Sequence, residues 1–306
     1  MALYKYVTPD RIDIISNELI RFTQPDALND PWETRPYIES MITDDALQKD
    51  IIERIQKDEI ITKFSESQWN KLNPIQKKIT TPKEIETYFT NWANTHPTEF
   101  ETEYNRILKE TIDTFKANQP IMVKGIPEGI NKTLGILSLT RDPDNLLMWA
   151  HYTNNHAGFV IEFDENHTFF SPRQSGGETL FGLKDVKYYE ERPHIEALLG
   201  VSWNWDLLFT FKSKPWEYEK ECRMIQLLSK ADQIINNPAG NIYLFSIQTE
   251  SIKSIIFGLR MSNIDKQKII QLVNNDIKYS HIKLFNTTME DNSFSISIKP
   301  IKYLGG

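Results

Sequence analysis

Residues 137–164, LSLTRDPDNLLMWAHYTNNHAGFVIEFD, contain the pattern that decides the fold class. Apolar runs at the two ends predict strands over 134–140 and 158–163, and the connection between them predicts a short helix. This region carries polar and aromatic side chains where a plain core would have none: Ser138, Thr140, Trp149, His151, Tyr152 and His156. Two strands joined by such a helix predict the floor of a pocket.

Two further segments have the same density of aromatic and charged residues. They are RFTQPDALNDPWE at 21–33 and KPWEYEKECRMIQLL at 214–228. Because the rest of the sequence is ordinary, we interpret the three segments as parts of one composite site.

The composition is that of a globular protein. The 306 residues are 40% hydrophobic and 25% charged, which is typical of a folded soluble chain. The net charge of −7 and the pI of about 5.5 argue against a dedicated nucleic-acid-binding protein, because such proteins carry a basic footprint. The single cysteine, Cys222, excludes an intrachain disulfide and a multi-cysteine zinc site. With no signal-peptide core and no apolar run of roughly 20 residues, we expect a cytoplasmic protein without a membrane partner.

The sequence changes character between residues 37 and 117, where Glu and Lys become more frequent. Three runs in this block predict helices over 44–64, 82–96 and 97–116. The segment TPKE at 81–84 supplies a capping box and a proline at the first helical position. We interpret the block as a helical insertion, which is a lid, a partner-binding face, or padding without a role in the site.

Strands are predicted on both sides of this insertion. Near the N-terminus LYKYV and LIRFT predict strands, separated by a helix over 10–19. A joint rich in Pro and Gly at 120–130 ends the insertion, and a further helix is predicted over 194–213. Because strands from both ends of the sequence enclose the helical block, we predict one α+β domain over 1–306. It has a mixed or antiparallel sheet and a helical insertion at 37–117.

Paired carboxylates are the strongest chemical signal. In a strand over 221–228 preceded by Glu219, side chains two residues apart share a face, so Glu219 and Glu221 would project together, with Arg223 next. Adjacent like charges suit a general base or the stabilisation of a cationic transition state. The alternative interpretation is an ordinary charge pattern on an edge strand.

Two other groups are candidates for a site. His151 shares a helix face with Asn155 one turn later, so an acid/base role is conceivable; a structural histidine is the alternative. Asn29-Asp30-Pro31 is either a simple turn or a loop that presents an amide and a carboxylate to a ligand. No metal site is expected, because the necessary spacing of His, Cys and carboxylates is not repeated.

Several motifs of known enzymes are absent from the sequence. There is no GxxxxGK[ST] loop, no GxGxxG after a strand, no GxSxG elbow and no HExxH pair. The standard nucleotide-binding folds, the α/β-hydrolases and the zincins are therefore not supported.

In their order along the chain, four segments resemble the bacterial family called domain of unknown function 2971. They are YKYV near the start, FTQPDALNDPWE, the stretch SLTRDPDNLLMWAHYTNNHAGFVIEFD, and K-x-x-x-W-E-Y-E-K-E-C-R from Lys212 to Arg223. The resemblance covers almost the whole chain except the helical block 37–117.

The sequence has an early strand with a polar residue in an LYxx setting, a later strand with S-x-T, and a third strand that opens with Glu-x-Glu. In this arrangement it resembles the ADP-ribosyltransferase fold. The resemblance implies that Lys5 or Tyr6 grips NAD where an arginine or histidine is usual, and that Ser138 and Thr140 line the nicotinamide pocket. It further implies that Glu221 is the catalytic glutamate and Glu219 the residue that activates or selects the acceptor. The remaining residues expected around the pocket are His151, Tyr152, Trp149, Asn29, Asp30 and Arg223.

Three functions follow as hypotheses. The first is an NAD-consuming transferase that modifies a protein or nucleic acid, such as a bacterial toxin or antiphage defence effector, with NAD as substrate and no metal. The second is a non-catalytic sensor of a nucleotide-like ligand, whose helical insertion binds an antitoxin or another protein. The third is a metal-independent nuclease or other hydrolase that uses Glu219, Glu221 and His151.

Overall fold

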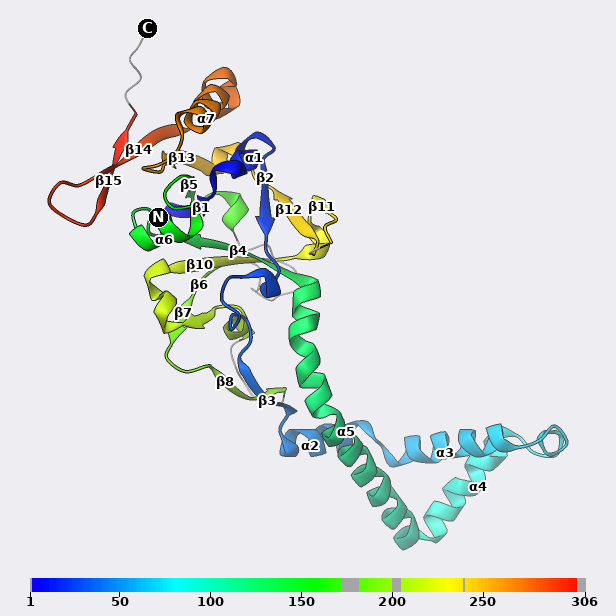
Figure 1. Cartoon of the computed structure of the whole chain (residues 1–306). Coiled ribbons are helices and arrows are strands. Elements are labelled where there is room, and N and C mark those ends of the chain that lie inside the picture. Colours follow the sequence, from blue (N-terminus) through cyan, green and yellow to red (C-terminus); the bar gives the residue numbers. More distant parts are fainter. Residues whose placement is uncertain (1, 172–181, 200–204, 239, 302–306) are drawn as a thin grey trace. The chain divides into compact units, whose positions relative to one another are not determined.

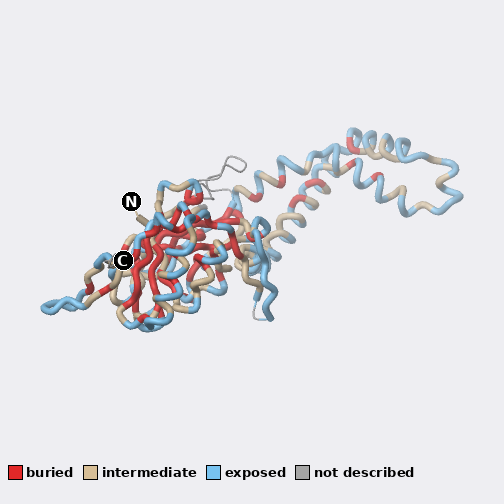
Figure 2. Tube along the Cα trace, turned by 90° about the horizontal axis from the view of Figure 1, so that it is seen from above, coloured by how far each residue is buried: buried red, intermediate tan, exposed pale blue. Residues whose placement is uncertain are grey.

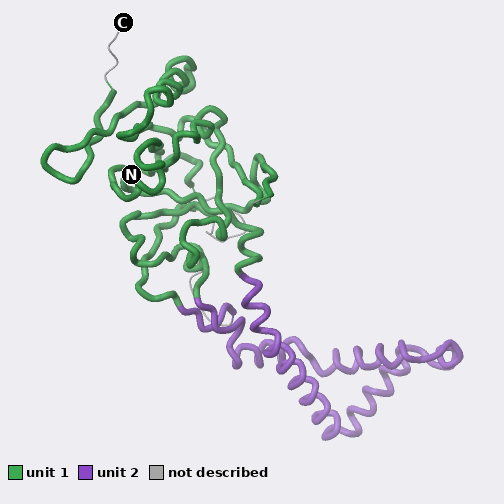
Figure 3. Tube along the Cα trace, in the orientation of Figure 1, with its two compact units in different colours: residues 1–36, 127–193, 204–306 green, residues 37–126, 194–203 purple. Residues whose placement is uncertain are grey.

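A computed structural model of the chain describes residues 2–171, 182–199, 205–238 and 240–301 (Figure 1). The chain divides into two compact units (Figure 3). Unit 1 consists of residues 1–36, 127–193 and 204–306, and unit 2 consists of residues 37–126 and 194–203. Unit 2 therefore contains the helical block expected at 37–117 together with a second segment that is distant in the sequence.

Unit 1 is built on an eight-stranded sheet. The strand order is β15 (Ile296–Pro300), β14 (Lys283–Met289), β13 (Ile252–Phe257), β5 (Phe159–Asp164), β1 (Ala2–Val7), β4 (Leu134–Thr140), β10 (Glu221–Leu227) and β6 (Leu183–Asp185). Strands β13 and β14 are parallel, and the other neighbours are antiparallel. The predicted α+β class is confirmed, and the strand predicted over 134–140 coincides with β4.

Apolar clusters cover both faces of this sheet. Cys222 and Met224 of β10 lie in the larger cluster, and Trp149 of α6 (Leu146–Tyr152) lies in a smaller one against β1. Figure 2 shows the buried residues concentrated along the strands. Because successive side chains of a strand face opposite sides, Glu221 and Arg223 lie on the other face of β10 from Cys222 and Met224.

Shorter elements complete unit 1. They are α1 (Asp13–Ser16), α7 (Asn263–Asn275), a three-stranded sheet of β11 (Gln233–Ile235), β12 (Ile242–Ser246) and β2 (Leu19–Phe22), and the parallel pair β7 (Lys187–Tyr189) and β9 (Phe211–Ser213). The helix predicted over 10–19 is too long, since it consists only of a 3₁₀ turn at Pro9–Ile12 and the single turn of α1. Residues 19–22 instead join the sheet with β12, so tertiary pairing decides where this helix ends.

The helix predicted over 194–213 is wrong. Within the described part of that range the chain forms β8 (His194–Leu199), a 3₁₀ turn (Trp205–Leu208) and β9. β8 belongs to unit 2, where it pairs in parallel with β3 (Tyr37–Ile42). Its buried residues include Ile195 and Ala197 at strand spacing.

The helices of unit 2 are α2 (Asp44–Arg54), α3 (Lys57–Lys71), α4 (Pro82–Thr95) and the first part of α5 (Pro97–Thr133). The capping box predicted for α4 is confirmed, since Thr81 and Glu84 bond each other's backbone N–H groups. A small core joins α2 to α5 through Leu47, Ile51 and Leu108.

The predicted joint at 120–130 is wrong because α5 continues through it to Thr133. Pro120 and Pro127 each remove one helical hydrogen bond, at a cost of about 3 kcal/mol, and Gly125 and Gly129 are poor helix formers; the helix is largely exposed here, so water can satisfy the freed carbonyl groups. Within the described ranges, α5 and the other helices lack the length and apolar character needed to cross a membrane.

Candidate functional site

Strands β1 and β4 are neighbours in the sheet but separate along their length. Their ladder contains the pair Tyr4↔Thr140, whereas nearer its start β4 is bridged to Thr23. Between these points Lys5 Nζ donates a hydrogen bond of 2.8 Å to the Ser138 carbonyl oxygen. The lysine therefore satisfies a backbone acceptor that a continuous ladder would have satisfied.

A cavity of about 220 Å³ lies at this gap. Many of the residues predicted to form a site line it: Lys5, Tyr6, Asn29, Ser138, Tyr152, Glu219 and Glu221. The three segments singled out in the sequence thus all contribute side chains to a single cavity.

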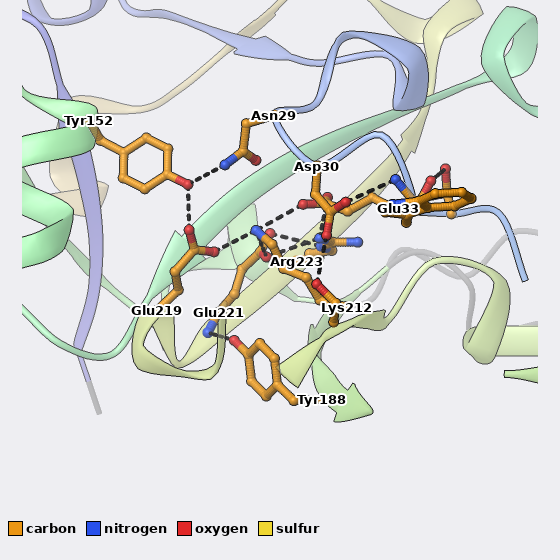
Figure 4. A network of polar contacts seen from close by, with 12 residues as sticks. Asn29, Asp30, Glu33, Tyr152, Tyr188, Lys212, Glu219, Glu221 and Arg223 are labelled. Atoms are coloured by element: carbon orange, nitrogen blue, oxygen red, sulfur yellow. Dashed lines mark hydrogen bonds and ion pairs between the residues drawn. The ribbon is translucent and has the colours of Figure 1, made fainter. Parts of the chain in front are cut away.

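A buried lysine lies at one wall of the cavity and contacts three carboxylates. Lys212 Nζ is 2.8 Å from Glu33 Oε1, 2.5 Å from Glu219 Oε2 and 3.3 Å from Glu221 Oε2. Figure 4 shows these side chains converging from separate segments of the chain. All of these side chains are less than 5% exposed, so the ion pairs are shielded from water.

Arg223 completes the network from the middle of β10. Its Nε is 2.8 Å from Glu221 Oε1, its Nη2 is 2.6 Å from Glu33 Oε2, and its Nη1 donates to the Phe209 carbonyl oxygen at 2.8 Å. The side chain has no exposed surface. Arg223 thus lies behind the cavity and fixes the carboxylates, instead of contacting a ligand.

The carboxylates of this network face three cations. Lys212 and Arg223 contact Glu33, Glu219 and Glu221 directly, and Glu221 and Glu219 also attract the ammonium of Lys5, which lines the same cavity. Burial alone would raise the pKa of Glu221, but Arg223 and Lys212 outweigh it and lower that pKa to about 2. Burial raises the pKa of Glu33 despite the same two cations. Glu221 is therefore ionised at any physiological pH.

The two predicted carboxylates converge by a different geometry from the one expected. Glu219 ends a 3₁₀ segment (Lys214–Glu219), Lys220 has a left-handed φ of 42°, and Glu221 begins β10. The expectation that Glu219 and Glu221 share one face of a strand is wrong, and Lys212 brings them together instead. β10 lies between β4 and β6, so an edge-strand pattern does not explain these charges.

Tyr152 and Asn29 extend the network across the cavity. The Tyr152 hydroxyl donates to Glu219 and accepts from Asn29 Nδ2 at 2.7 Å. Burial, together with the negative charge of Glu219, raises the pKa of Tyr152, so the hydroxyl remains a donor.

Asp30 serves mainly to shape the loop that carries Asn29. Asp30 Oδ1 accepts from the Trp32 backbone N–H at 2.9 Å, as expected of the predicted turn, and Oδ2 accepts from the Ser213 hydroxyl at 3.1 Å. Asp30 is 4% exposed and is not among the residues lining the cavity.

Three predicted residues lie away from the cavity. Trp149 is buried in the core, where its Nε1 donates to the Pro143 carbonyl oxygen at 2.9 Å. The Thr140 hydroxyl donates to the Glu219 carbonyl oxygen at 2.6 Å and so positions that residue. His151 is exposed and contacts the rings of Tyr152 and Tyr218.

Sequence reasoning did not assign a role to Glu33, Lys212 or Tyr188. The Tyr188 hydroxyl accepts from the Glu221 backbone N–H at 2.7 Å and so fixes the start of β10. A signal for Lys212 does exist, because it is the one charged residue of the segment LLFTFKS at 207–213, and a charge in such a segment is buried only when paired.

The pH dependence of stability tests whether the Lys5 ammonium is shielded from water. Burial lowers the pKa of its ammonium from 10.5 to about 8, although Glu221 attracts the charge. Between pH 8 and pH 10.5 Lys5 binds more protons in the unfolded chain than in the folded chain. Its contribution to the free energy of unfolding therefore rises with pH. We expect urea unfolding to show wild type gaining stability over Lys5→Met from pH 8 to pH 10.5. The control is Lys71→Met at an exposed position, whose free energy of unfolding should depend on pH as that of wild type does. If the curve of stability against pH for Lys5→Met is parallel to the wild-type curve, Lys5 is solvated.

Within the described residues no group of three or more His, Cys, Asp and Glu side chains is arranged to hold a metal ion. The carboxylates of the network already contact Lys212 and Arg223. The chemistry available in the cavity is therefore that of ionised carboxylates, an ammonium and phenolic hydroxyls.

Residues 148–224 match the family model described as "Protein of unknown function (DUF2971)". The resemblance to this family is confirmed over a stretch that contains Tyr152, Lys212, Glu219, Glu221 and Arg223. No curated protein and no solved structure matches the chain, and the resemblance to the ADP-ribosyltransferase fold stays a hypothesis.

Proposed function

We propose that the cavity binds the nicotinamide–ribose part of NAD and that the protein transfers ADP-ribose to a macromolecular acceptor. The resemblance to ADP-ribosyltransferases implies that a carboxylate, a serine-bearing strand and an N-terminal strand residue surround one pocket. Glu221, Ser138 and Lys5, from β10, β4 and β1, line the same cavity. That convergence is the observation that carries the proposal.

The charge of the network suits the bond that would break. When the C–N bond between ribose and nicotinamide breaks, its electron pair goes to the nicotinamide nitrogen and the ribose acquires oxocarbenium character, as in other glycosyl transfers. The ionised Glu221 carboxylate, which lines the cavity, opposes this developing positive charge. With a pKa of about 2, Glu221 is already ionised and needs no proton transfer to act.

Other residues of the cavity have supporting roles in this proposal. Glu219 accepts the proton of the attacking acceptor group, and the Tyr152 hydroxyl orients the Glu219 carboxylate. The rings of Tyr6 and Tyr152 line the cavity and can stack on nicotinamide. Trp149 is fully buried and is not available for stacking. A role as toxin or defence effector would follow from such an activity.

The direct test is release of nicotinamide from labelled NAD by the purified full-length protein, with and without cell lysate. We expect Glu221→Gln to lower release by at least about 100-fold, the usual effect of removing a preorganised electrostatic group. Because Gln leaves Arg223 and Lys212 less well paired, the variant should also lose about 1–3 kcal/mol of stability. Tyr152→Phe removes only a hydroxyl and serves as the milder companion variant.

The exposed His151 separates this proposal from the hydrolase hypothesis. His151→Ala should leave nicotinamide release unchanged, because no hydrogen bond or ion pair in the described chain joins His151 to a carboxylate. Loss of activity in His151→Ala would favour the hydrolase, in which this histidine is the base.

A second candidate function is a non-catalytic binding module. It is favoured by the low exposure of Glu219 and Glu221, 3% and 5%, and by their ion pairs with Lys212 and Arg223. A thermal shift with NAD but no turnover would support this second function and contradict the transferase. Nicotinamide release that survives in Glu221→Gln would also contradict the transferase proposal.

A further inference from the structure

Helices α3, α4 and α5 of unit 2 line an apolar groove with a cavity of about 390 Å³. Two of its walls consist of residues one helical turn apart, namely Ile60 and Phe64 from α3 and Tyr88 and Trp92 from α4. Phe100 belongs to the third wall. Residues at this spacing share a helix face, so each helix presents an apolar stripe to the groove.

This apolar surface is poorly covered within the described part of unit 2. Together α3 and α4 bury only Ile61, Ser65 and Ala93, whereas Phe64 is 45% and Tyr88 64% exposed. Figure 2 shows the sparse burial along these helices. Helices of 15 and 14 residues depend on tertiary burial for much of their stability. An exposed apolar patch of this kind marks an interaction surface.

We propose that this groove binds a cationic amphipathic helix of a partner protein. All its walls are helices, so no strand edge is available for a peptide to extend, and a helix that inserts its apolar face is the matching mode of recognition. The cavity has room for a few anchoring side chains, not for a whole helix.

The charge of the partner follows from the rim of the groove. Glu99 and Glu103 are the charged residues that line it, and no Lys or Arg does. Glu103 is paired with Arg106 at 2.5 Å, but within the described chain Glu99 makes no ion pair. Lys or Arg residues beside the apolar anchors of a bound helix would neutralise Glu99.

The same acidic rim argues against a second copy of this chain as the occupant. In a symmetric dimer the same patch lies on both sides of the interface. No Lys or Arg of the described groove lining would then face the unpaired Glu99 from the other copy, and where Glu99 lies near the two-fold axis the two Glu99 carboxylates would repel each other.

Two fluorescently labelled peptides of ~18 residues, long enough for about five helical turns, test the proposal. They share Leu at helical spacing and differ in carrying Lys or Glu at the remaining positions. We expect fluorescence anisotropy with the full-length protein to show at least about 10-fold tighter binding of the Lys peptide. Glu99→Lys should lower this preference several-fold, and Tyr88→Ser should weaken both peptides.

The matched control is Glu66→Lys, which adds the same charge at an exposed position of α3 outside the groove. Because selectivity is a ratio between two peptides, a small loss of helix stability in a variant does not alter it. Equal binding of the two peptides, no binding of either, or the same loss in Glu66→Lys would overturn the proposal. So would a dimer, detected by sedimentation, that is disrupted by Glu99→Lys.

Discussion

Replacing Gly158 or Gly258 by alanine will lower the free energy of unfolding by more than about 3 kcal/mol. A Cβ atom on Gly158 would lie 2.1 Å from the Val7 carbonyl oxygen, and one on Gly258 would lie 2.2 Å from the His156 carbonyl oxygen. Both obstacles are backbone atoms of the central part of unit 1, which cannot move aside as a flexible side chain can.

The surrounding backbone explains why the two glycines are needed. After α6, three successive residues have left-handed φ values: Asn154 at 51°, Asn155 at 56° and His156 at 67°. Each such residue costs about 1 kcal/mol or more. In return, the N–H groups of Asn155 and His156 bond carbonyl oxygens of α6 at 3.1 Å, which satisfies the helix end. The Arg260 N–H then bonds the His156 carbonyl oxygen at 2.9 Å.

Urea unfolding followed by circular dichroism measures this effect, and the chain offers matched controls. Gly125 and Gly129 of α5 have nothing within 4 Å of an added Cβ. Alanine at either position should raise stability by about 0.5–1 kcal/mol, because alanine is the better helix former. A Gly258→Ala protein as stable as Gly125→Ala would show that β5, β13 and the turn after α6 are not packed as described.

The parts of the fold that were predicted from sequence depend on local patterns. β4, α6 and β10 were found because their apolar spacing and flanking residues lie within a single short window. The capping box of α4 is a four-residue signal and was confirmed. The parallel pairing of β3 with β8 was missed because its partners lie far apart in the chain, and each strand taken alone is short.

In the candidate site, too, local sequence patterns identified residues but did not reveal contacts between distant segments. The cavity-lining residues Ser138, Tyr152 and Glu221 stood out because each lies in a segment dense in polar and aromatic groups. The network behind them joins Glu33 to Arg223 across 190 positions of sequence, a relation no local pattern reveals. Sequence reasoning therefore identified most of the cavity wall and part of the charged network, but not Glu33 and Lys212, which complete it.

Lys212→Met will strongly destabilise the protein. It removes one of the two cations that contact the three carboxylates directly, and breaking a buried ion pair in this way costs about 3–5 kcal/mol. Lys214→Met is the matched control, because Lys214 is 41% exposed and pairs with an exposed Glu217. We expect urea unfolding near neutral pH to show a large loss for Lys212→Met and little change for Lys214→Met.

The pH dependence tests the electrostatic cause separately from the loss of packing. In wild type the pKa of Glu221 is lowered from 4.5 to about 2, so its contribution is present above pH 4.5 and is lost as the pH falls towards 2. Without Lys212, burial outweighs the remaining cation and raises the carboxylate pKa values above those of the unfolded chain. The folded variant then binds more protons, and its stability should rise as the pH falls from neutral towards 5.

A charge-balanced double variant completes this test. Lys212→Met with Glu219→Gln removes one cation together with one carboxylate, so the net charge of the network is again that of wild type. Part of the lost stability should therefore return, and the rise in stability at low pH should weaken. If the double variant is no more stable than Lys212→Met, the cost arises from the cavity left by the lysine side chain.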